Sequence, residues 1–305
     1  MESYDLIIIG SGPAGITAGI YAAIYNLKFL VIGKLNGGAI SEAHKVCNYP
    51  SQYNITGFEL TNKMVAHLSD LGGKILNEEV REVIKDNESF LIKTNNSKYK
   101  AKKIILAIGR VKEKLNIKGE DKFLGRGVSY CATCDSAFFK NKTVAVVGGG
   151  NAAVSAALLL AEHAKKIYII HRKDKFARVD QILLSRLEKE AKITIIFNSE
   201  ISEINGEKAV TGITLKDNTL AVDGVFIEIG FSPPDSLIRQ LNLETENKYV
   251  RVDKFQRTSL RGVFAVGDIT NNPLKQVITA CSEGSIATTT AYDEIRAEMA
   301  QIAEI

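Results

Sequence analysis

The hydrophobic positions of the chain form the same arrangement twice. A short, β-branched apolar run leads into a glycine-rich turn and then into a helical pattern of small residues, at residues 4–25 and again at residues 143–164. Another apolar run follows each of these units, at residues 29–32 and 166–170. Two strand–turn–helix–strand units in one chain predict an α/β fold with two Rossmann-like dinucleotide-binding domains, each a three-layer ββα arrangement.

The pattern between and after these units is mixed. The run at residues 262–266 ends at Gly267 and Asp268, where a carboxylate could accept hydrogen bonds from the ribityl hydroxyls of a flavin. Gly-Asp is also a common pair in plain turns. The remaining pattern predicts helices at residues 57–71, 181–190 and 276–302, and strands at residues 80–94, 104–108, 193–197, 212–215 and 224–229.

The composition is that of an ordinary globular protein. The chain has 305 residues, of which 45% are hydrophobic, and this length suggests about two domains. The net charge of +4 is small and spread along the chain, so it gives no case for nucleic-acid binding. The start of the chain lacks the features of a signal peptide, and no apolar run reaches the roughly 18 residues that span a bilayer. We therefore expect a cytoplasmic protein with no membrane segment.

The two glycine turns have the spacing of dinucleotide-binding motifs. In such a motif the first glycine permits the tight turn, the second lets the backbone approach a pyrophosphate, and the third lets helix and strand pack closely. The first turn has Gly10, Gly12 and Gly15, and the second has Gly148 and Gly150. Each turn follows a predicted strand and opens a predicted helix, which is the context the motif requires. A tight turn without a ligand is the alternative.

Basic residues follow the strand of the second unit. His171, Arg172 and Lys173 end this strand, and Arg178 comes shortly after, with no acidic residue at the strand end. Cationic side chains there suit a 2′-phosphate, and hence NADP rather than NAD. A solvated basic loop is the alternative.

A close cysteine pair is the candidate reactive group. Cys131 and Cys134 can close a disulfide across one turn, and such pairs often have a lowered thiol pKa. The adjacent Asp135 can hold or deliver a proton during exchange. Zinc would need two more ligands, and the other cysteines, Cys47 and Cys281, are far away in the sequence. We interpret those two as structural and expect no metal.

These parts form one electron pathway. A nicotinamide delivers two electrons as a hydride, a disulfide consumes two electrons, and a flavin can pass electrons between them.

The chain resembles the low-molecular-weight thioredoxin reductases over essentially its whole length. The resemblance rests on the two glycine turns, on a Cys-Ala-Thr-Cys-Asp run between them, and on the last strand that ends in Gly-Asp. The matching segments are residues 10–15, 37–38, 48–50, 125–135, 148–153, 171–176 and 262–268.

The resemblance implies a discontinuous FAD-binding domain at residues 1–113 and 245–305, with an NAD(P)H-binding domain inserted at residues 114–244. It implies NADPH as donor and a thioredoxin-like protein as acceptor, with Cys134 next to the flavin and Cys131 attacking the partner disulfide. Asp135 would be the general acid/base. A homodimer and a swivelling inserted domain, with hinges near residues 112–118 and 244–248, are further expectations.

The resemblance also assigns residues to the two cofactors. FAD would be lined by Gly10, Gly12, Pro13, Ala14, Gly15, Gly37, Gly38, Asn48, Gly109, Gly267, Asp268 and Gln276. The nicotinamide cofactor would be held by Gly148, Gly150, Asn151, Ala152, Ala153, His171, Arg172, Lys173 and Arg178. Arg126 is a candidate for docking the partner.

The basic loop departs from the pattern of these reductases. Lys173 replaces an arginine, Ala177 stands where a further arginine is usual, and Arg178 comes one position late. Lysine binds phosphate as a point charge without the two-pronged geometry of arginine. One alternative is a related flavin disulfide reductase that takes electrons from NADH or ferredoxin, or that passes them to another dithiol protein. A second alternative is a flavoprotein sensor without turnover.

Overall fold

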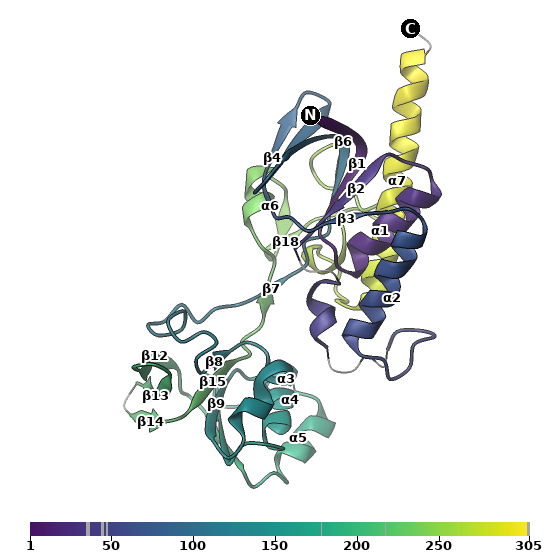
Figure 1. The fold of residues 1–305 in the computed structure, drawn as a ribbon. Coiled ribbons are helices and arrows are strands. Elements are labelled where there is room, and N and C mark those ends of the chain that lie inside the picture. The colour runs from purple at the N-terminus through teal and green to yellow at the C-terminus, as the bar shows by residue number, and fades with distance from the viewer. Residues whose placement is uncertain (35–36, 44–45, 47, 178, 217, 304–305) are drawn as a thin grey trace. The chain divides into compact units, whose positions relative to one another are not determined.

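The structure is a computed structural model that describes residues 1–305 apart from residues 35–36, 44–45, 47, 178, 217 and 304–305. The chain divides into two compact units (Figure 1). The first unit contains Met1–Val111 and Ser232–Ile305, and the second contains Lys112–Phe231. Two short segments connect the units, β7 (Val111–Lys112) and β16 (Phe231–Ser232), and these pair with each other.

A mainly parallel sheet forms the centre of the first unit. Its order is β3-β2-β1-β6-β5-β4, and β19 pairs with the second half of β6. The pairs among β3, β2, β1, β6 and β19 are parallel, whereas β4, β5 and β6 pair antiparallel. The strands are β1 (Glu2–Ile9), β2 (Phe29–Ile32), β3 (Ile75–Leu76), β4 (Val80–Asp86), β5 (Ser89–Thr94), β6 (Lys98–Leu106) and β19 (Val263–Ala265), with a small separate pair of β17 (Thr245–Glu246) and β18 (Tyr249–Val250).

Helices cover this sheet, and alternate residues of β1 face two different cores. Leu6 and Ile8 pack with α1, α2 and α7, while Ile7 and Ile9 pack with residues of α6. Burial on both faces explains why this strand is a continuous apolar run. The helices are α1 (Pro13–Ile24), α2 (Gly57–Asp70), α6 (Ser236–Gln240) and α7 (Val277–Ala303), with the single turns η1 (Gly38–Glu42) and η3 (Gly267–Ile269).

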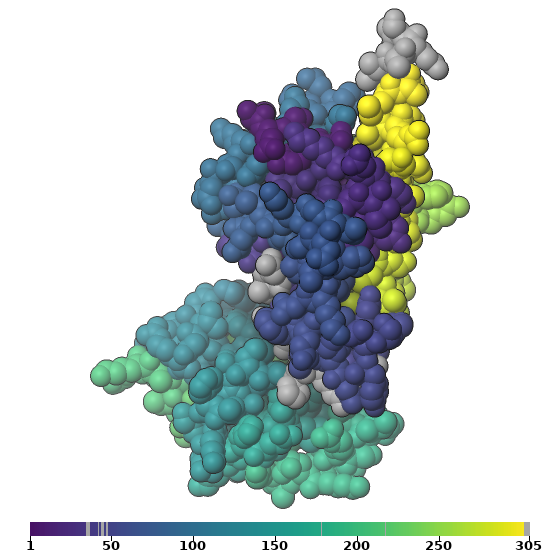
Figure 2. Space-filling model, turned by 45° about the vertical axis from the view of Figure 1, so that its right-hand side comes forward, coloured from purple at the N-terminus to yellow at the C-terminus, as the bar shows by residue number. Residues whose placement is uncertain are grey.

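Segments from the two ends of the chain build this unit together. Helix α7, in yellow, packs directly against α1, in purple, and the two lie side by side in both views (Figures 1 and 2). The contact is close because a side chain at Gly284 would lie 2.2 Å from the carbonyl oxygen of Ala14.

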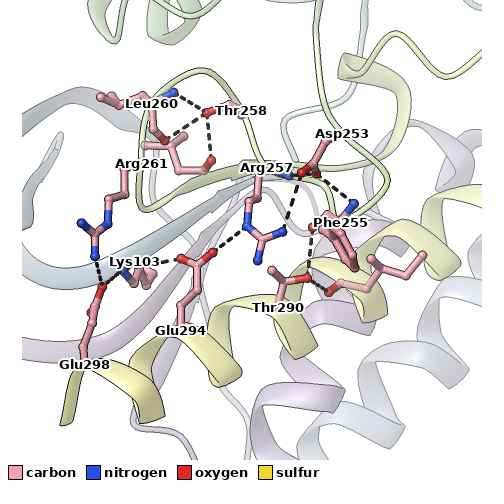
Figure 3. A network of polar contacts seen from close by, with 12 residues as sticks. Lys103, Asp253, Phe255, Arg257, Thr258, Leu260, Arg261, Thr290, Glu294 and Glu298 are labelled. Carbon is pink, nitrogen blue, oxygen red and sulfur yellow. Dashed lines mark hydrogen bonds and ion pairs between the residues drawn. The ribbon is translucent and has the colours of Figure 1, made fainter. Parts of the chain in front are cut away.

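Ion pairs fix the last turns of α7 to the sheet (Figure 3). The ammonium of Lys103, on β6, lies 2.6 Å from Glu298 and 3.7 Å from Glu294, and only 4% of its side chain is exposed. Arg261 contacts Glu298 at 3.3 Å, and Arg257 contacts Glu294 at 2.7 Å. Each carboxylate therefore has two cationic neighbours.

The second unit has three layers. A parallel sheet in the order β11-β10-β9-β15-β8 has helices on one face and a three-stranded antiparallel sheet, β12-β13-β14, on the other. This confirms the predicted α/β class and the ββα layering. The elements are β8 (Val128–Ser129), α3 (Ala132–Asp135), η2 (Ser136–Phe139), β9 (Thr143–Val147), α4 (Asn151–Leu160), β10 (Lys166–Ile170), α5 (Gln181–Leu187), β11 (Ile193–Ile196), β12 (Ile201–Gly206), β13 (Val210–Leu215), β14 (Thr219–Ala221) and β15 (Gly224–Ile227).

The chain returns to the first unit at Phe231/Ser232, earlier than the expected domain boundary after residue 244. The reason lies in α6 and the turn after it. The core of the first unit buries four residues of this segment against β1 and β6, namely Leu237, Ile238, Leu241 and Leu243.

Among the described residues, none of the helices combines the length and the apolar character that a membrane-spanning helix requires.

Candidate functional site

Four parallel strands of the first unit end in register at one edge of the sheet. Ile9 pairs with both Ile32 and Leu106, and Leu106 pairs with Ala265. The chain after these strand ends contains Gly10, Gly109, Gly267 and Asp268. Ligands of open α/β sheets bind outside the carboxyl ends of such strands. The topology therefore brings together residues that are spread over most of the sequence.

The fold itself requires two of the three glycines in the first turn. Gly10 has φ +117°, and a Cβ on it would lie 2.1 Å from the carbonyl oxygen of Ala107. A Cβ on Gly15 would lie 1.9 Å from the carbonyl oxygen of Gly10. Gly12 differs, because a Cβ there would meet nothing closer than 3.8 Å. Packing within the chain thus explains Gly10 and Gly15, whereas a side chain at Gly12 would make only ordinary van der Waals contact with Gly37 and Gly38.

Gly12 lies at the start of α1. Gly12 is the N-cap, no side chain caps the helix, and Pro13 occupies its first position. The first N–H groups of a helix have no partner inside the helix, and together with the helix dipole they favour an anion. A backbone without a side chain and uncapped N–H groups at one place fit a phosphate, whereas a tight turn without a ligand needs neither.

The other residues assigned to FAD gather around this turn. The N–H of Gly37 donates to the carbonyl oxygen of Ser11 at 2.8 Å, which places Gly37 and Gly38 beside Gly12. Ala14 lies next to Gly267, since a Cβ on that glycine would be 3.1 Å from the Cβ of Ala14.

Four further assigned residues come from distant parts of the chain. The Asn48 amide donates to Gln276 Oε1 at 2.8 Å, 228 residues away in sequence. Gly109 has φ +63°, and a Cβ on it would have nothing within 4 Å. Asp268 accepts from Arg110, an interaction that no local sequence signal indicates.

The second unit repeats this edge. Val147 pairs with Ile170 and Ile227, so β9, β10 and β15 end together. Gly148 has φ +148°, and a Cβ on it would lie 2.2 Å from the carbonyl oxygen of Glu228. Gly150 is the N-cap of α4 without a side-chain cap, and a Cβ on it would meet nothing within 4 Å.

The first residues of α4 have different surroundings. Ala152 is exposed, and Ala153 is buried against the glycine turn. Asn151 forms a reciprocal pair with Asp180, donating at 2.8 Å and accepting from the backbone N–H at 2.9 Å. Asn151 thereby holds the start of α5, and both its amide nitrogen and its amide oxygen have hydrogen-bond partners within the chain.

The basic loop after β10 is anchored by a buried histidine. The ring of His171 lies against Gly149, where a Cβ would be 2.0 Å from the ring, and it stacks on Phe176 at 5.6 Å. Its Nε2 donates to the carbonyl oxygen of Lys175 at 3.2 Å, because a carbonyl can only accept. Arg172 and Lys173 are exposed at the same strand end. Arg178 lies outside the described residues, as does Cys47.

The cysteine pair forms a disulfide at the edge strand of this sheet. The sulfurs of Cys131 and Cys134 are 2.09 Å apart, and the Cα atoms are 5.3 Å apart. Cys131 is the N-cap of α3, and its sulfur accepts from the N–H of Cys134 at 3.2 Å. Cys134 is exposed, while Cys131 and Asp135 are partly exposed. The pair is a disulfide in which Cys134 is an exposed residue, and this differs from the alternative of two ordinary buried cysteines.

Buried polar groups before Cys131 hold it in place, and sequence reasoning missed them. The Cys131 N–H donates to Ser129 Oγ at 3.0 Å. Tyr130 donates to Glu120, and the same carboxylate accepts from the backbone N–H of Asn116 at 2.6 Å. Burial and the adjacent Glu120 raise the pKa of Tyr130 well above its usual range, so its hydroxyl stays a donor.

The remaining described cysteine, Cys281, is buried in the first unit. Its sulfur lies 3.9 Å from the carbonyl oxygen of Pro13, and burial raises the pKa of its thiol. Among the described residues, no group of three or more His, Cys, Asp or Glu side chains has the arrangement of a metal site. Arg126, the candidate for partner docking, is exposed.

Two nucleotide-type edges and one disulfide define a class of flavin-linked disulfide oxidoreductases. Residues 4–284 match the family described as pyridine nucleotide-disulphide oxidoreductase. Thioredoxin reductases from Bacillus subtilis and Treponema pallidum are each 39% identical to this chain over 93% of its length, and the matches cover 92% and 94% of their own. The crystal structure of Lactococcus lactis thioredoxin reductase is similar with a TM-score of 0.88 and 36% identity, covering 96% of this chain and 99% of that one. The chain belongs to the pyridine nucleotide-disulphide oxidoreductase family, within its low-molecular-weight thioredoxin reductase group.

A solved structure with a different electron donor in its name is also similar. The ferredoxin-flavin thioredoxin reductase of Clostridium acetobutylicum has a TM-score of 0.56 and 36% identity, covering 97% of this chain and 99% of that one.

Proposed function

We propose that this chain is an NADPH-dependent, FAD-containing reductase of a thioredoxin-like protein. The observation that carries the proposal is a glycine that the packing of the chain does not require at each of two uncapped helix starts, Gly12 and Gly150, both at the carboxyl edge of a parallel sheet. Two such places call for two dinucleotides. The disulfide of Cys131 and Cys134 supplies a two-electron acceptor in the same chain.

The first unit would hold FAD, and the second would hold the nicotinamide cofactor. Pro13, Ala14 and Gly15 begin the helix that would receive the FAD pyrophosphate, and Asp268 would accept from sugar hydroxyls. Arg172 and Lys173 are exposed where a 2′-phosphate would lie, and this supports NADPH over NADH. When bound, the two cofactors supply a hydride and pass its electron pair to the disulfide.

The chain's own groups then carry out the exchange. Two electrons and two protons open the Cys131–Cys134 bond to two thiols. The Cys131 thiolate attacks the partner disulfide and forms a mixed disulfide, which releases one partner thiol. Cys134 next attacks Cys131, so that the internal disulfide forms again and the second partner thiol leaves. The N–H of Cys134 stabilises a thiolate on Cys131, and Asp135 would hold or deliver the proton.

Paired cysteine variants test this assignment. Cys134→Ser is expected to keep rapid flavin reduction by NADPH but to lose turnover with thioredoxin, whereas Cys281→Ser, the matched control, keeps both. A flavoprotein sensor without turnover would show no thioredoxin-dependent rate even in the unchanged protein, and that result would overturn the proposal.

The second candidate is a reductase that takes its electrons from ferredoxin, which the similarity to the Clostridium structure favours. The two candidates differ at Gly150, whose open space has no use without a nucleotide in the second unit. Flavin reduction by NADPH without ferredoxin supports the first candidate. Reduction by reduced ferredoxin alone would support the second.

The proposed enzyme would act in the cytoplasm as a homodimer. Sedimentation equilibrium of the flavin-loaded protein tests the second part, since a mass close to 33.3 kDa would contradict it.

A further inference from the structure

A buried carboxylate on α7 holds the turn that carries Asp268. Glu283 is 3% exposed, and its Oε2 accepts from the backbone N–H of Gly267 at 2.6 Å and lies 3.2 Å from the hydroxyl of Thr270. Its Oε1 accepts from the Asn272 amide at 2.5 Å. The orientation of that amide is fixed, because Asn272 Oδ1 accepts from the N–H of Leu274 at 3.0 Å. Both oxygens of Glu283 therefore act as acceptors toward this one turn.

Burial of the Glu283 carboxylate costs free energy of folding. Burial raises the pKa of Glu283, and only its hydrogen bonds to Gly267, Thr270 and Asn272, with the charge of Lys275, oppose that shift. A buried carboxylate whose partners all belong to one turn makes the conformation of that turn specific, because any other conformation leaves the charge without donors. Gly267 has φ +75°, a backbone conformation that glycine adopts without strain.

Arg110 acts on the same turn from the end of β6. Its Nε and Nη2 lie 2.9 Å and 2.8 Å from Asp268, and both contacts go to the same oxygen, Oδ2. Among the described residues, none donates to Asp268 Oδ1. A third of the Asp268 side chain is exposed, at 31%. Arg110 thus fixes one carboxylate oxygen of Asp268 and leaves part of the side chain accessible.

We infer that Glu283 and Arg110 are positioning residues of the flavin site. Glu283 fixes the backbone of the Gly267–Asp268 turn, and Arg110 fixes the carboxylate, so that Asp268 Oδ1 is presented to a sugar hydroxyl before the cofactor arrives. Preorganisation of this kind raises affinity, since the cost of ordering the turn is met during folding. The inference rests on the proposed function, because it assumes that the first unit binds FAD.

The test measures FAD affinity of the full chain after its flavin has been removed, by the quenching of flavin fluorescence. Arg110→Gln and Glu283→Gln are each expected to weaken FAD binding about tenfold or more, because each removes a charged hydrogen-bond partner. In Glu283→Gln, the new side-chain amide would place an N–H donor against either the Gly267 N–H or the Asn272 amide. The matched control is Glu294→Gln on the same helix, whose partners Arg257 and Lys103 lie away from the turn. It is expected to lower thermal stability without changing FAD affinity.

A compensating variant separates positioning from general damage. In Glu283→Gln combined with Asn272→Asp, the donor and acceptor roles are exchanged, while the contact of residue 272 to the N–H of Leu274 is kept. Restored FAD affinity in this double variant is the expected result. Glu283→Gln and Arg110→Gln proteins that bind FAD as tightly as the unchanged chain would overturn the inference, and so would a loss in Glu283→Gln that the double variant leaves uncorrected. An unchanged chain that binds no FAD would instead refute the proposed function.

Discussion

The sharpest prediction concerns the second glycine turn, where two neighbouring glycines have different reasons to be glycine. Gly150→Ala places a methyl group where nothing lies within 4 Å, at an N-cap with φ −111°. Alanine is a weaker N-cap than glycine, so the expected loss of stability is about 0.5 kcal/mol. Gly148 has φ +148°, and the Cβ that Gly148→Ala adds would lie 2.2 Å from the carbonyl oxygen of Glu228. Its cost is about 2–6 kcal/mol from backbone strain and overpacking together.

Gly150→Ala, the variant with the small loss of stability, should have a large effect on NADPH binding. If the space at Gly150 receives a pyrophosphate, a methyl group there weakens NADPH binding by about tenfold to hundredfold, the range that overpacking gives. The assay is anaerobic stopped-flow reduction of the flavin at increasing NADPH concentration, with thermal unfolding and flavin content measured on the same samples. Gly12→Ala is the matched control, because a Cβ there meets nothing closer than 3.8 Å. It should lower flavin content instead.

The outcome that refutes this reasoning is specific. A Gly150→Ala protein that is stable, retains its flavin and is reduced with an unchanged dependence on NADPH concentration would show that the open space is not the nicotinamide site. A Gly150→Ala protein that unfolds would show that the glycine is needed by the fold, contrary to the geometry.

Three further predictions concern titratable groups. Lys103→Met should lower the free energy of unfolding by less than about 1.5 kcal/mol, because Glu294 and Glu298 keep Arg257 and Arg261. Glu294→Gln combined with Glu298→Gln should lower it by about 3–5 kcal/mol, because the buried ammonium of Lys103 loses its ion-pair partners. Equal losses for the two proteins in urea unfolding would contradict this. Burial raises the pKa of Cys281, so in the reduced protein iodoacetamide at neutral pH should label Cys134 well before Cys281, with Cys281 labelling faster as pH rises; peptide mapping that finds equal early labelling would refute it. Burial and Glu2 raise the pKa of Tyr4 to about 12, above the value of about 10 in an unfolded chain, so the folded state keeps this proton longer and stability should fall as pH rises from about 10 to 12. Tyr4→Phe should lose less stability over that range than the unchanged protein, and a parallel loss would count against the shift.

The sequence predicted the features whose signals are local. The apolar runs of β1 and β9 are continuous because both faces of each strand are buried, and the glycines that follow each run mark the turn directly. The disulfide needed only the spacing of Cys131 and Cys134. These signals sufficed for the fold class and for the glycine turns.

Long-range polar contacts were not predictable in the same way. Arg110 and Asp268 are separated by 158 positions, and nothing in either local sequence indicates that they meet. Glu283 has the sequence context of an ordinary charged position in a long helix, although it is buried. Glu120 and Tyr130 likewise meet only because the chain folds back before the disulfide.

The strand β12 and the point where the chain returns to the first unit were also missed, for physical reasons. The strand β12 has register shifts against β13, which break the alternation that would have revealed it. The return to the first unit at Ser232 depends on which core receives Leu237 and Ile238, and an apolar pattern does not say which core that is.

We expect electrons to pass from NADPH through this chain to a protein disulfide. The most direct measurement is anaerobic turnover of the flavin-loaded protein with NADPH and thioredoxin, following NADPH oxidation and thiol formation together. One NADPH should be oxidised for each thioredoxin disulfide reduced, NADH should be a poorer donor, and Cys134→Ser should abolish thiol formation. Flavin that NADPH does not reduce, or reduced flavin without thiols on thioredoxin, would contradict it.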